Sequence, residues 1–403
     1  MKSHLLHADI PRGFTFAATA CGLKKGGLDL ALLTSDTPAT AAAVFTTNRI
    51  QAAPVRLSRE HLQKSGRKIR AVIVNSGNAN CCTGSQGMAA SRKTAAKLSH
   101  SLGCWPNEIL VCSTGVIGVP LRVEKILSTI PQLAQSRSSN PSAFDEFTRA
   151  IMTTDTRPKW AAAKCRVGGK QVRILGCTKG SGMIEPNMAT MLGFLATDAA
   201  VSAALLSKAL RAVVSRTFNA ITVDGDTSTN DTVTLFANGE SGASKIKSEN
   251  GDYQKFCAAL ETVCRSLALA IVADGEGAQR VIEIQVRGAA SDRAANKIAR
   301  TIANSPLVKT AFAGADPNWG RILAAAGRSG VSFEPGRVDI ELAGIRVCRR
   351  GREQPFDERV AHRGMLAKYV PVIVNLYSGG GAARIWTCDF TAEYVRINAS
   401  YRS

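Results

Sequence analysis

The sequence predicts an α/β protein with mixed sheets flanked by helices. Through the first half of the 403-residue chain, short apolar runs alternate with segments whose apolar residues recur at helical spacing. From about residue 281 to residue 390, a strand, two helices and several further strands predict a smaller α/β unit. A chain of this length can hold two or three domains with their own cores. The pattern is not that of a doubly wound nucleotide-binding fold.

The first half is expected to alternate between strands and helices. Gly103 stands where a glycine commonly ends a helix, and Asn140 stands where a side chain commonly caps one. The strands are expected at residues 70–74, 109–112 and 170–176, and the helices at residues 86–102, 122–135 and 141–152.

The second half continues the alternation. An apolar run of strand length begins at Met191, Ser202 caps a helix, and residues 224–231 form a polar loop. Further strands are expected at residues 220–223 and from residue 281, and further helices at residues 253–271, 291–303 and 321–326.

The chain is basic, with 51 lysine and arginine residues against 31 acidic residues and a formal net charge of +20. Such a balance favours anionic partners. The basic residues are scattered, however, and no basic stripe with interleaved aromatic residues marks a nucleic-acid surface. No stretch approaches eighteen uninterrupted apolar residues. We therefore expect neither nucleic acid nor a membrane as a partner, and interpret the charge as a solubility trait with modest steering.

The cysteines indicate a cytoplasmic protein. Eleven cysteines, an odd number, include no C-x-x-C pair, and most lie in apolar contexts. This usage predicts reduced, buried thiols, with neither a disulfide framework nor a zinc site. The N-terminal residues show neither the apolar core of a signal peptide nor the pattern of a transit peptide.

Histidine-dependent chemistry is not expected. The chain lacks the G-x-S-x-G, G-x-x-x-x-G-K-[ST] and H-E-x-x-H motifs. A hydroxyl nucleophile would then need another base, and the α-amine of an N-terminal threonine, with a pKa of roughly 7.7–8.0, fits that role. The histidines lie in polar stretches that are expected to be exposed: His4, His7, His61, His100 and His362.

One central segment can supply such a threonine. Gly180, Gly182 and Pro186 preclude a regular helix, and the apolar run begins directly after Thr190. Cleavage between Ala189 and Thr190 would leave the Thr190 α-amine beside its own hydroxyl. A plain loop that leads into a strand has the same spacing, so the segment alone does not decide between them.

A second loop follows a buried strand at residues 113–115. Its backbone N–H groups could converge on a developing oxyanion, and Gly115 would allow a close approach. A donor of this kind is worth about 10²–10³ in rate. The alternative interpretation is an ordinary turn at the end of a strand.

Taken together, these segments resemble the ornithine acetyltransferases, also called bifunctional glutamate N-acetyltransferases. Residues 179–184 (KGSGMI) and 186–192 (PNMATML) match the self-processing signature of that family. The resemblance covers essentially the whole chain. The other matching motifs are residues 74–80 (VNSGNAN) with 83–84 (TG), 153–156 (TTDT), 274–278 (DGEGA), 316–321 (DPNWGR), 386–389 (WTCD) and 394–399 (YVRINA).

The resemblance implies a DmpA/ArgJ-like N-terminal-nucleophile fold. It implies a precursor cut into residues 1–189 and 190–403, which assemble as a heterotetramer with two copies of each chain. The implied reaction belongs to arginine biosynthesis and moves an acetyl group from N2-acetylornithine to glutamate through an acetyl-threonine, without a metal or organic cofactor. The sequence leaves open whether acetyl-CoA is a second acetyl donor.

The resemblance also assigns roles to single residues. Thr190 matches the nucleophile of both self-cleavage and acetyl transfer, and Thr114 and Gly115 match the oxyanion-hole pair. Thr154 and Thr156 stay open as alternatives to Thr153. The residues that match substrate contacts are Thr153, Lys179, Thr190, Glu276, Asn398 and Ser403.

Some positions depart from the family pattern. Glu185 is a charge where the pattern has a neutral residue or histidine, and we expect it to change the rate of self-cleavage. Ser400 and Arg402 alter the end of the tail that carries Ser403.

Two other functions remain open from the sequence. An aminopeptidase or amidase of the same fold would pass the acyl group to water. A non-catalytic binding protein would keep the bond between Ala189 and Thr190 intact.

Overall fold

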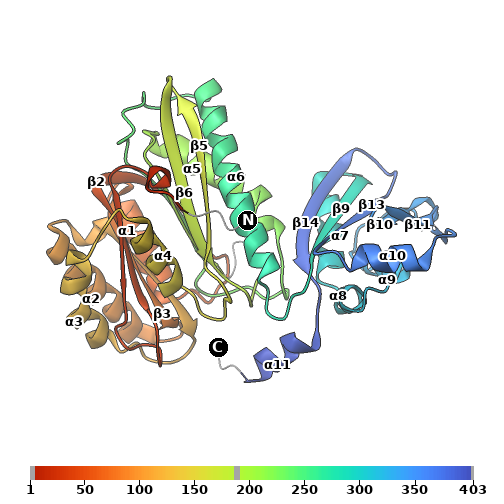
Figure 1. The fold of residues 1–403 in the computed structure, drawn as a ribbon, viewed down its shortest axis with the longest axis horizontal. Coiled ribbons are helices and arrows are strands. Elements are labelled where there is room, and N and C mark those ends of the chain that lie inside the picture. Colours follow the sequence, from red (N-terminus) through yellow and green to blue (C-terminus); the bar gives the residue numbers. More distant parts are fainter. Residues whose placement is uncertain (1–4, 186–190, 401–403) are drawn as a thin grey trace.

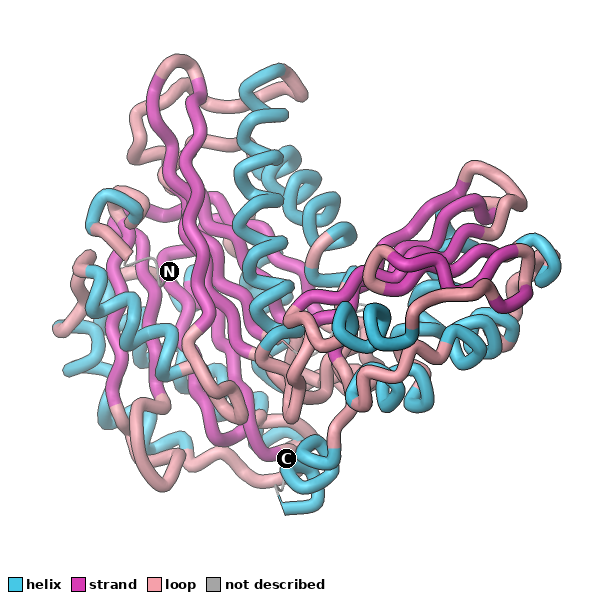
Figure 2. The backbone as a smooth tube through the Cα atoms, turned by 45° about the vertical axis from the view of Figure 1, so that its right-hand side comes forward, coloured by secondary structure: helices cyan, strands magenta, loops and turns pink. Residues whose placement is uncertain are grey.

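The computed structural model describes residues 5–185 and 191–400. Within these residues the chain forms two α/β units, each built on one sheet (Figure 1). Strands run both parallel and antiparallel in each sheet, and helices flank them (Figure 2). The expected α/β class with mixed sheets is therefore confirmed.

The larger unit comes first and contains an eight-stranded sheet in its described part. The strand order is β4-β3-β2-β8-β7-β6-β5, and β1 pairs with β2 beside this path. The strands are β1 (Phe14–Thr19), β2 (Leu30–Phe45), β3 (Lys68–Asn78), β4 (Ile109–Val116), β5 (Lys159–Val167), β6 (Lys170–Lys179), β7 (Leu192–Thr197) and β8 (Thr232–Ala237). The helices are α1 (Ala53–Lys64), α2 (Gly84–Leu102), α3 (Val123–Gln135), α4 (Pro141–Ala150), α5 (Ala203–Arg216) and α6 (Gly251–Ala273).

Strand β2 joins the two halves of this sheet. Its first part pairs with β1 and β3, and its last part pairs with β8. Between them, residues 36–38 are exposed and the register with β3 shifts between Thr34 and Ala39. Pro38 has no N–H to offer a ladder, which suits it to such an irregularity.

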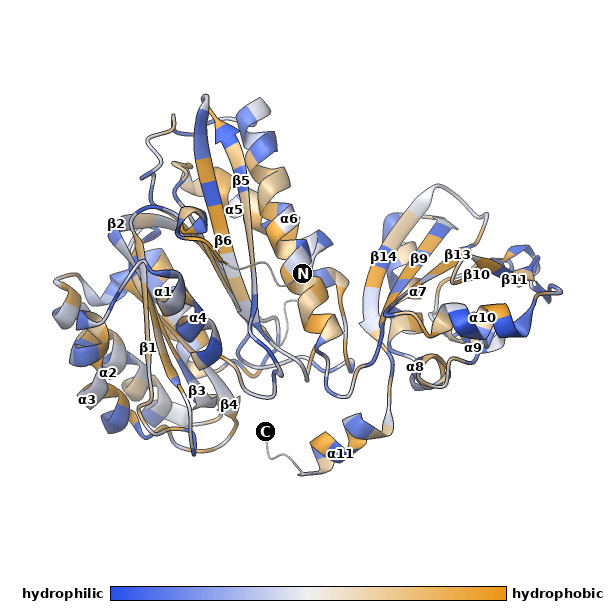
Figure 3. Ribbon diagram, viewed as in Figure 1, coloured by the Kyte–Doolittle hydropathy of each residue, from blue (hydrophilic) through white to orange (hydrophobic). Residues whose placement is uncertain are grey.

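The strands use alternate side chains for separate cores. One face of both halves of the sheet packs around α4, where Phe147 meets Phe16 and Phe194 edge to face. The opposite faces pack on helices α1 to α3 in one half and on α5 and α6 in the other. Figure 3 shows the resulting alternation of polar and apolar residues along the β5–β6 hairpin.

Helix α6 is long and apolar enough to cross a membrane by length and composition alone. One of its faces, which includes Phe256, Leu260, Val263 and Leu267, is buried in the core beside β5 and β6. Burial in the protein accounts for this composition.

The smaller unit begins at Val281, and its sheet has the order β12-β11-β10-β13-β9-β14. Helix α7 packs on β9 and β14, and the core of this unit is continuous with that around α6. After β14 the chain returns to the larger unit as α11 (Ala392–Ser400) (Figure 1). The other elements are β9 (Val281–Ala289), α7 (Asp292–Ala303), α8 (Pro306–Ala313), α9 (Trp319–Gly327), β10 (Asp339–Leu342), β11 (Ile345–Arg349), β12 (Arg352–Glu353), α10 (Glu358–Met365), β13 (Tyr369–Asn375) and β14 (Gly381–Cys388).

The expected helices and most expected strands are confirmed, with one clear error. Residues 220–223 form no strand of a sheet: a 3-10 turn ends at Ala220, and Ile221 makes a single bridge to Trp386. The segment crosses between the two units, so its apolar side chains are buried without a ladder. Gly103 ends α2 as expected, whereas Asn140 and Ser202 precede their helices without a side-chain capping bond.

The expectation for the histidines was wrong at His61. This residue is 5% exposed on the inner face of α1, and its Nδ1 lies 2.8 Å from the carbonyl oxygen of Ile109. Burial lowers the pKa of His61. The eleven cysteines are all free, and Cys82 is the exposed one among them. His4 lies outside the described residues.

Candidate active site

The ends of β3 and β4 form one wall of the site. The two strands run in parallel, with Thr114 opposite Ser76 and Gly115 opposite Gly77. Gly115 has φ +131°, and a Cβ there would lie 2.4 Å from the carbonyl carbon of Gly77. Only glycine therefore allows this approach of the two strand ends.

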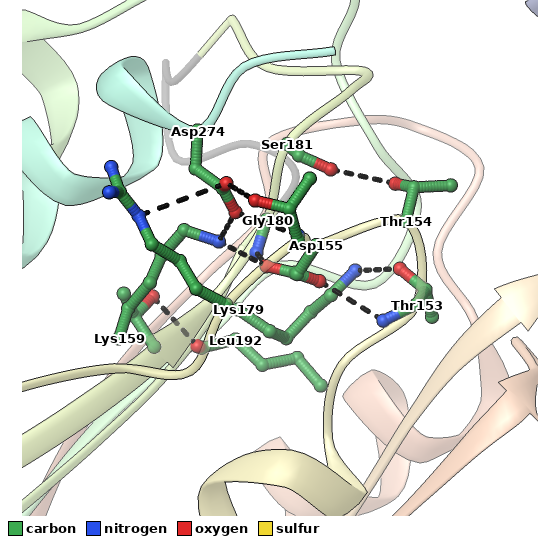
Figure 4. Close-up of polar contacts among 12 residues, drawn as sticks. Thr153, Thr154, Asp155, Lys159, Lys179, Gly180, Ser181, Leu192 and Asp274 are labelled. Carbon is green, nitrogen blue, oxygen red and sulfur yellow. Dashed lines mark hydrogen bonds and ion pairs between the residues drawn. The ribbon is translucent and has the colours of Figure 1, made fainter. Parts of the chain in front are cut away.

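Lys179 ends β6 and reaches toward that wall. Its side chain is buried, and its Nζ lies 2.7 Å from Thr153 Oγ1 and 3.2 Å from Thr114 Oγ1. Figure 4 shows Lys179 directed at Thr153. Burial lowers the pKa of Lys179, and the nearby Asp155 carboxylate opposes that shift. The Lys179 Nζ is thus held beside the hydroxyl of Thr114.

The three candidate threonines after α4 have different surroundings. Thr153 and Thr154 both line the cavity described below, and Thr154 Oγ1 lies 2.7 Å from Ser181 Oγ. Thr156 points elsewhere, because its hydroxyl and its N–H both donate to the Asp274 carboxylate. The geometry favours Thr153 or Thr154 over Thr156 as a substrate contact.

Glu276 and Asn398 come from distant parts of the chain. Glu276 follows α6, and its N–H donates to the Ser181 carbonyl at 2.9 Å. Asn398 lies in α11, and its Nδ2 donates to Glu276 Oε2 at 2.8 Å. Thr391 and Tyr394 hold α11 in place through hydrogen bonds to the Gly277 carbonyl and the Asp224 carboxylate. The tail thus folds back onto the larger unit.

One cavity gathers these groups. A larger cavity, of about 920 Å³, lies in the smaller unit beside residues 314–320, but it contains none of the expected site residues. We take the smaller cavity, between the β3–β4 wall and Glu276, as the candidate active site, because a lysine, a carboxylate and several hydroxyls converge there. Its lining residues are Ala79, Thr114, Gly115, Ile117, Thr153, Thr154, Lys179, Gly182, Met183, Ser228, Thr229, Asn230, Glu276 and Asn398.

The expected nucleophile Thr190, the cleavage residue Ala189 and the tail residue Ser403 lie outside the described residues. The chain on either side of residues 186–190 is held firmly. The Asp224 carboxylate accepts the N–H groups of Met183 and Ile184 at 2.6 and 2.8 Å.

Glu185 is fixed by Arg300 Nη1 and Asn304 Nδ2, each at 2.9 Å, so its carboxylate ties this end to α7. On the far side, the N–H of Met191 donates to Asp231 Oδ1 at 2.7 Å. Asn230, beside Asp231, donates to the Ser113 carbonyl next to Thr114. The described residues on both sides of 186–190 therefore lie near the cavity.

Several charged residues around the site did not emerge from the sequence. Asp155 and Asp274 fall within motifs that match the family, so the sequence does mark these two positions. Lys159, which lies between these two carboxylates, belongs to no motif. Across residues 5–185 and 191–400, no three histidine, cysteine or acidic side chains gather as they would around a metal ion.

Comparisons of the sequence with known proteins identify one family. The model of the ArgJ family matches residues 15–403. The arginine biosynthesis bifunctional protein ArgJ of Thermotoga neapolitana is 47% identical over 398 residues, which are 98% of this chain and 100% of the relative. That of Symbiobacterium thermophilum is 48% identical over 396 residues, 98% of each chain. The crystal structure of the Bacillus halodurans protein of the same name is 43% identical and covers 51% of this chain and 96% of its own, with a TM-score of 0.49.

Proposed function

The chain belongs to the ArgJ family, and we propose that it moves the acetyl group of N2-acetylornithine to glutamate in arginine biosynthesis. The proposal rests on membership of the family over nearly the whole length and on one structural observation. Lys179, Thr114 and Gly115 meet Glu276 and Asn398 around one cavity, although they come from four separate parts of the chain.

The first step is self-cleavage. Thr190 Oγ attacks the Ala189 carbonyl, and the ester that forms is hydrolysed, which frees the Thr190 α-amine. The anchoring of Met183 and Ile184 by Asp224, and of Met191 by Asp231, supports this step, because fixed flanking residues limit the freedom of the reacting groups between them.

The second step is acetyl transfer. Thr190 attacks the acetyl carbonyl with its own amine as base, ornithine leaves, and glutamate then accepts the acetyl group from the acetyl-threonine. The N–H of Gly115 and the Thr114 hydroxyl hold the oxyanion, and Lys179 adds positive potential beside them. Glu276 suits a substrate ammonium group, and Asn398 suits the polar backbone of an amino acid.

The mature enzyme is a cytoplasmic heterotetramer of two 1–189 chains and two 190–403 chains. The names of the curated relatives, which call them bifunctional, support acetyl-CoA as a second acetyl donor for glutamate. The basic charge of the chain suits that anionic donor.

A denaturing gel and one activity assay test the proposal. Wild-type protein is expected to run as two fragments near half size, and Thr190→Ala as one full-length band. The conservative Thr190→Ser variant keeps a hydroxyl and is expected to retain some cleavage. Ornithine release from acetylornithine should depend on glutamate. A single full-length wild-type band would refute self-cleavage, and glutamate-independent release would indicate a hydrolase instead.

A further inference from the structure

A buried ion cluster lies behind the cavity wall and contributes nothing to its lining. Lys159, the first residue of β5, places its Nζ 2.6 Å from Asp155 Oδ1 and 2.5 Å from Asp274 Oδ2. Its side chain is 1% exposed, and those of the two carboxylates are 0% and 4% exposed. We call Lys159, Asp155 and Asp274 the Lys159 cluster (Figure 4).

Asp155 connects the cluster to two of the cavity-lining side chains. Its Oδ2 accepts the N–H of Thr153 at 3.0 Å, and its Oδ1 accepts the N–H of Gly180 at 2.7 Å. Gly180 directly follows Lys179 at the end of β6. The Asp155 carboxylate therefore fixes the backbone at both Thr153 and Lys179.

Asp274 connects the cluster to a third cavity-lining side chain, that of Glu276. It stands at the end of α6, two residues before Glu276, and accepts the N–H and the hydroxyl of Thr156. Through Lys159 the turn that carries Glu276 is tied to the loop of residues 153–156. The carbonyl of Ser181, which accepts the Glu276 N–H, closes the ring of contacts.

Lys159 is the buried counter-ion that Asp155 and Asp274 share. Asp155 and Asp274 supply two negative charges, and Lys159 and Lys179 supply two positive ones, all four being buried. A buried carboxylate needs both a counter-ion and hydrogen-bond donors. Replacing Lys159 with a neutral side chain leaves Asp155 and Asp274 with Lys179 and with Arg157, whose Nε lies 3.9 Å from Asp274 Oδ1 and whose side chain is 58% exposed. The three attached segments must then shift to admit water or other donors.

We propose that Lys159 and Asp155 are positioning residues for acetyl transfer, which set the spacing of Thr153, Lys179 and Glu276 around the substrate. This inference rests on the proposed function. The Lys159 cluster touches no substrate and acts through the three segments it joins. A displacement of about 1 Å by a change outside the reacting groups can cost about 10²-fold in rate.

The Lys159 cluster also acts on the pKa of Lys179. Burial lowers this pKa, Asp155 raises it, and Lys159 lowers it further. Removing Lys159 should therefore extend activity to higher pH, and removing the Asp155 charge should end activity at lower pH, because transfer needs Lys179 protonated. The charged groups that act on Lys179 are Asp155, Asp231, Glu276, Lys159 and Lys24.

The experiment compares Lys159→Met with Lys164→Met in the processed enzyme. Lys164 is the matched control, because it lies on the same strand and pairs with an aspartate, Asp9, at 2.7 Å, but at the surface. We expect Lys159→Met to lower kcat/KM by about 10- to 100-fold, the cost of a displacement of up to about 1 Å, with a higher KM for acetylornithine. It should also move the basic limb of the pH profile upward. Lys164→Met should leave both unchanged.

Asp155→Asn keeps the shape of the side chain and should move the basic limb the opposite way. If Lys159→Met does not fold, this variant decides alone. Kinetics and a basic limb that match those of Lys164→Met would overturn the positioning role. A wild-type enzyme without glutamate-dependent ornithine release would instead overturn the proposed function. In that case the positioning is still tested by the rise in Tm that ornithine causes. This rise is expected to be smaller in Lys159→Met than in Lys164→Met.

Discussion

Gly115→Ala is the most direct test of the wall formed by β3 and β4. A Cβ on Gly115 would lie 2.4 Å from the carbonyl carbon of Gly77, 2.5 Å from the Asn78 nitrogen and 2.8 Å from the Gly77 Cα. All three are backbone atoms, so no side chain can rotate away. Ordinary contact begins at 3.4 Å, and the two strand ends must therefore separate by about 1 Å. A displacement of that size costs about 10²-fold in rate, close to the loss of an oxyanion donor.

A matched control exists three residues further on. Gly118 also has a left-handed φ, +80°, but a Cβ there would meet nothing within 4 Å. Both alanine variants therefore suffer the backbone strain, about 1–3 kcal/mol, and only Gly115→Ala forces the strands apart. The comparison separates the effect of position from that of strain.

The assay is kcat for glutamate-dependent ornithine release, normalised to the processed protein seen on a denaturing gel. We expect Gly115→Ala to lose about 10²-fold and Gly118→Ala to stay near wild type. Equal turnover in the two variants would refute the reasoning, because the clash with Gly77 would then have no consequence for the oxyanion wall.

Three further results are expected. Glu185→Gln removes the charge held by Arg300 and should slow self-cleavage by about fivefold, the equivalent of about 1 kcal/mol. Turnover by the processed enzyme should not change. A time course of cleavage on a denaturing gel, run for both proteins, would contradict this if the two rates were equal. Although burial alone would raise it, the pKa of Asp155 is lowered to about 2 by Lys179, Lys159 and the Gly180 N–H. This carboxylate therefore contributes about 2 kcal/mol of stability that is complete above about pH 4 and lost as the pH falls toward 2; denaturant titrations should show less acid sensitivity in Asp155→Asn, and an identical pH dependence would exclude the contribution. Phe147→Ala should lower the free energy of unfolding by about 3–5 kcal/mol, since its buried ring meets two other phenylalanine rings; urea unfolding with a loss under 1 kcal/mol would mean that this core can collapse around the gap.

The sequence by itself determined the local features and the family. Helical periodicity is a property of neighbouring residues, so helices such as α2, α4 and α6 were predictable within a few positions. The sequence predicted that Gly115 would allow a close approach to an oxyanion, whereas its contact with the Gly77 backbone was not predicted. The long motifs along the chain predicted the ArgJ family, which the comparisons confirmed.

Tertiary structure decided what lies beside what. Residues 220–223 have the composition of a strand, yet they cross between the two units and form no strand of a sheet. A strand needs partners to form its ladder, and those partners are set by segments far along the chain. Asn398 reaches Glu276 across 122 positions of sequence, and only the return of α11 brings them together.

Lys159 makes the same point most clearly. An isolated lysine at the start of a strand resembles a solvated charge, and nothing in its neighbours predicts otherwise. Its importance arises from the two carboxylates that packing places within 2.6 Å of it and from the exclusion of water around all three. The sequence supplied the reactive groups, and the packing of distant segments fixed their spacing and their charge.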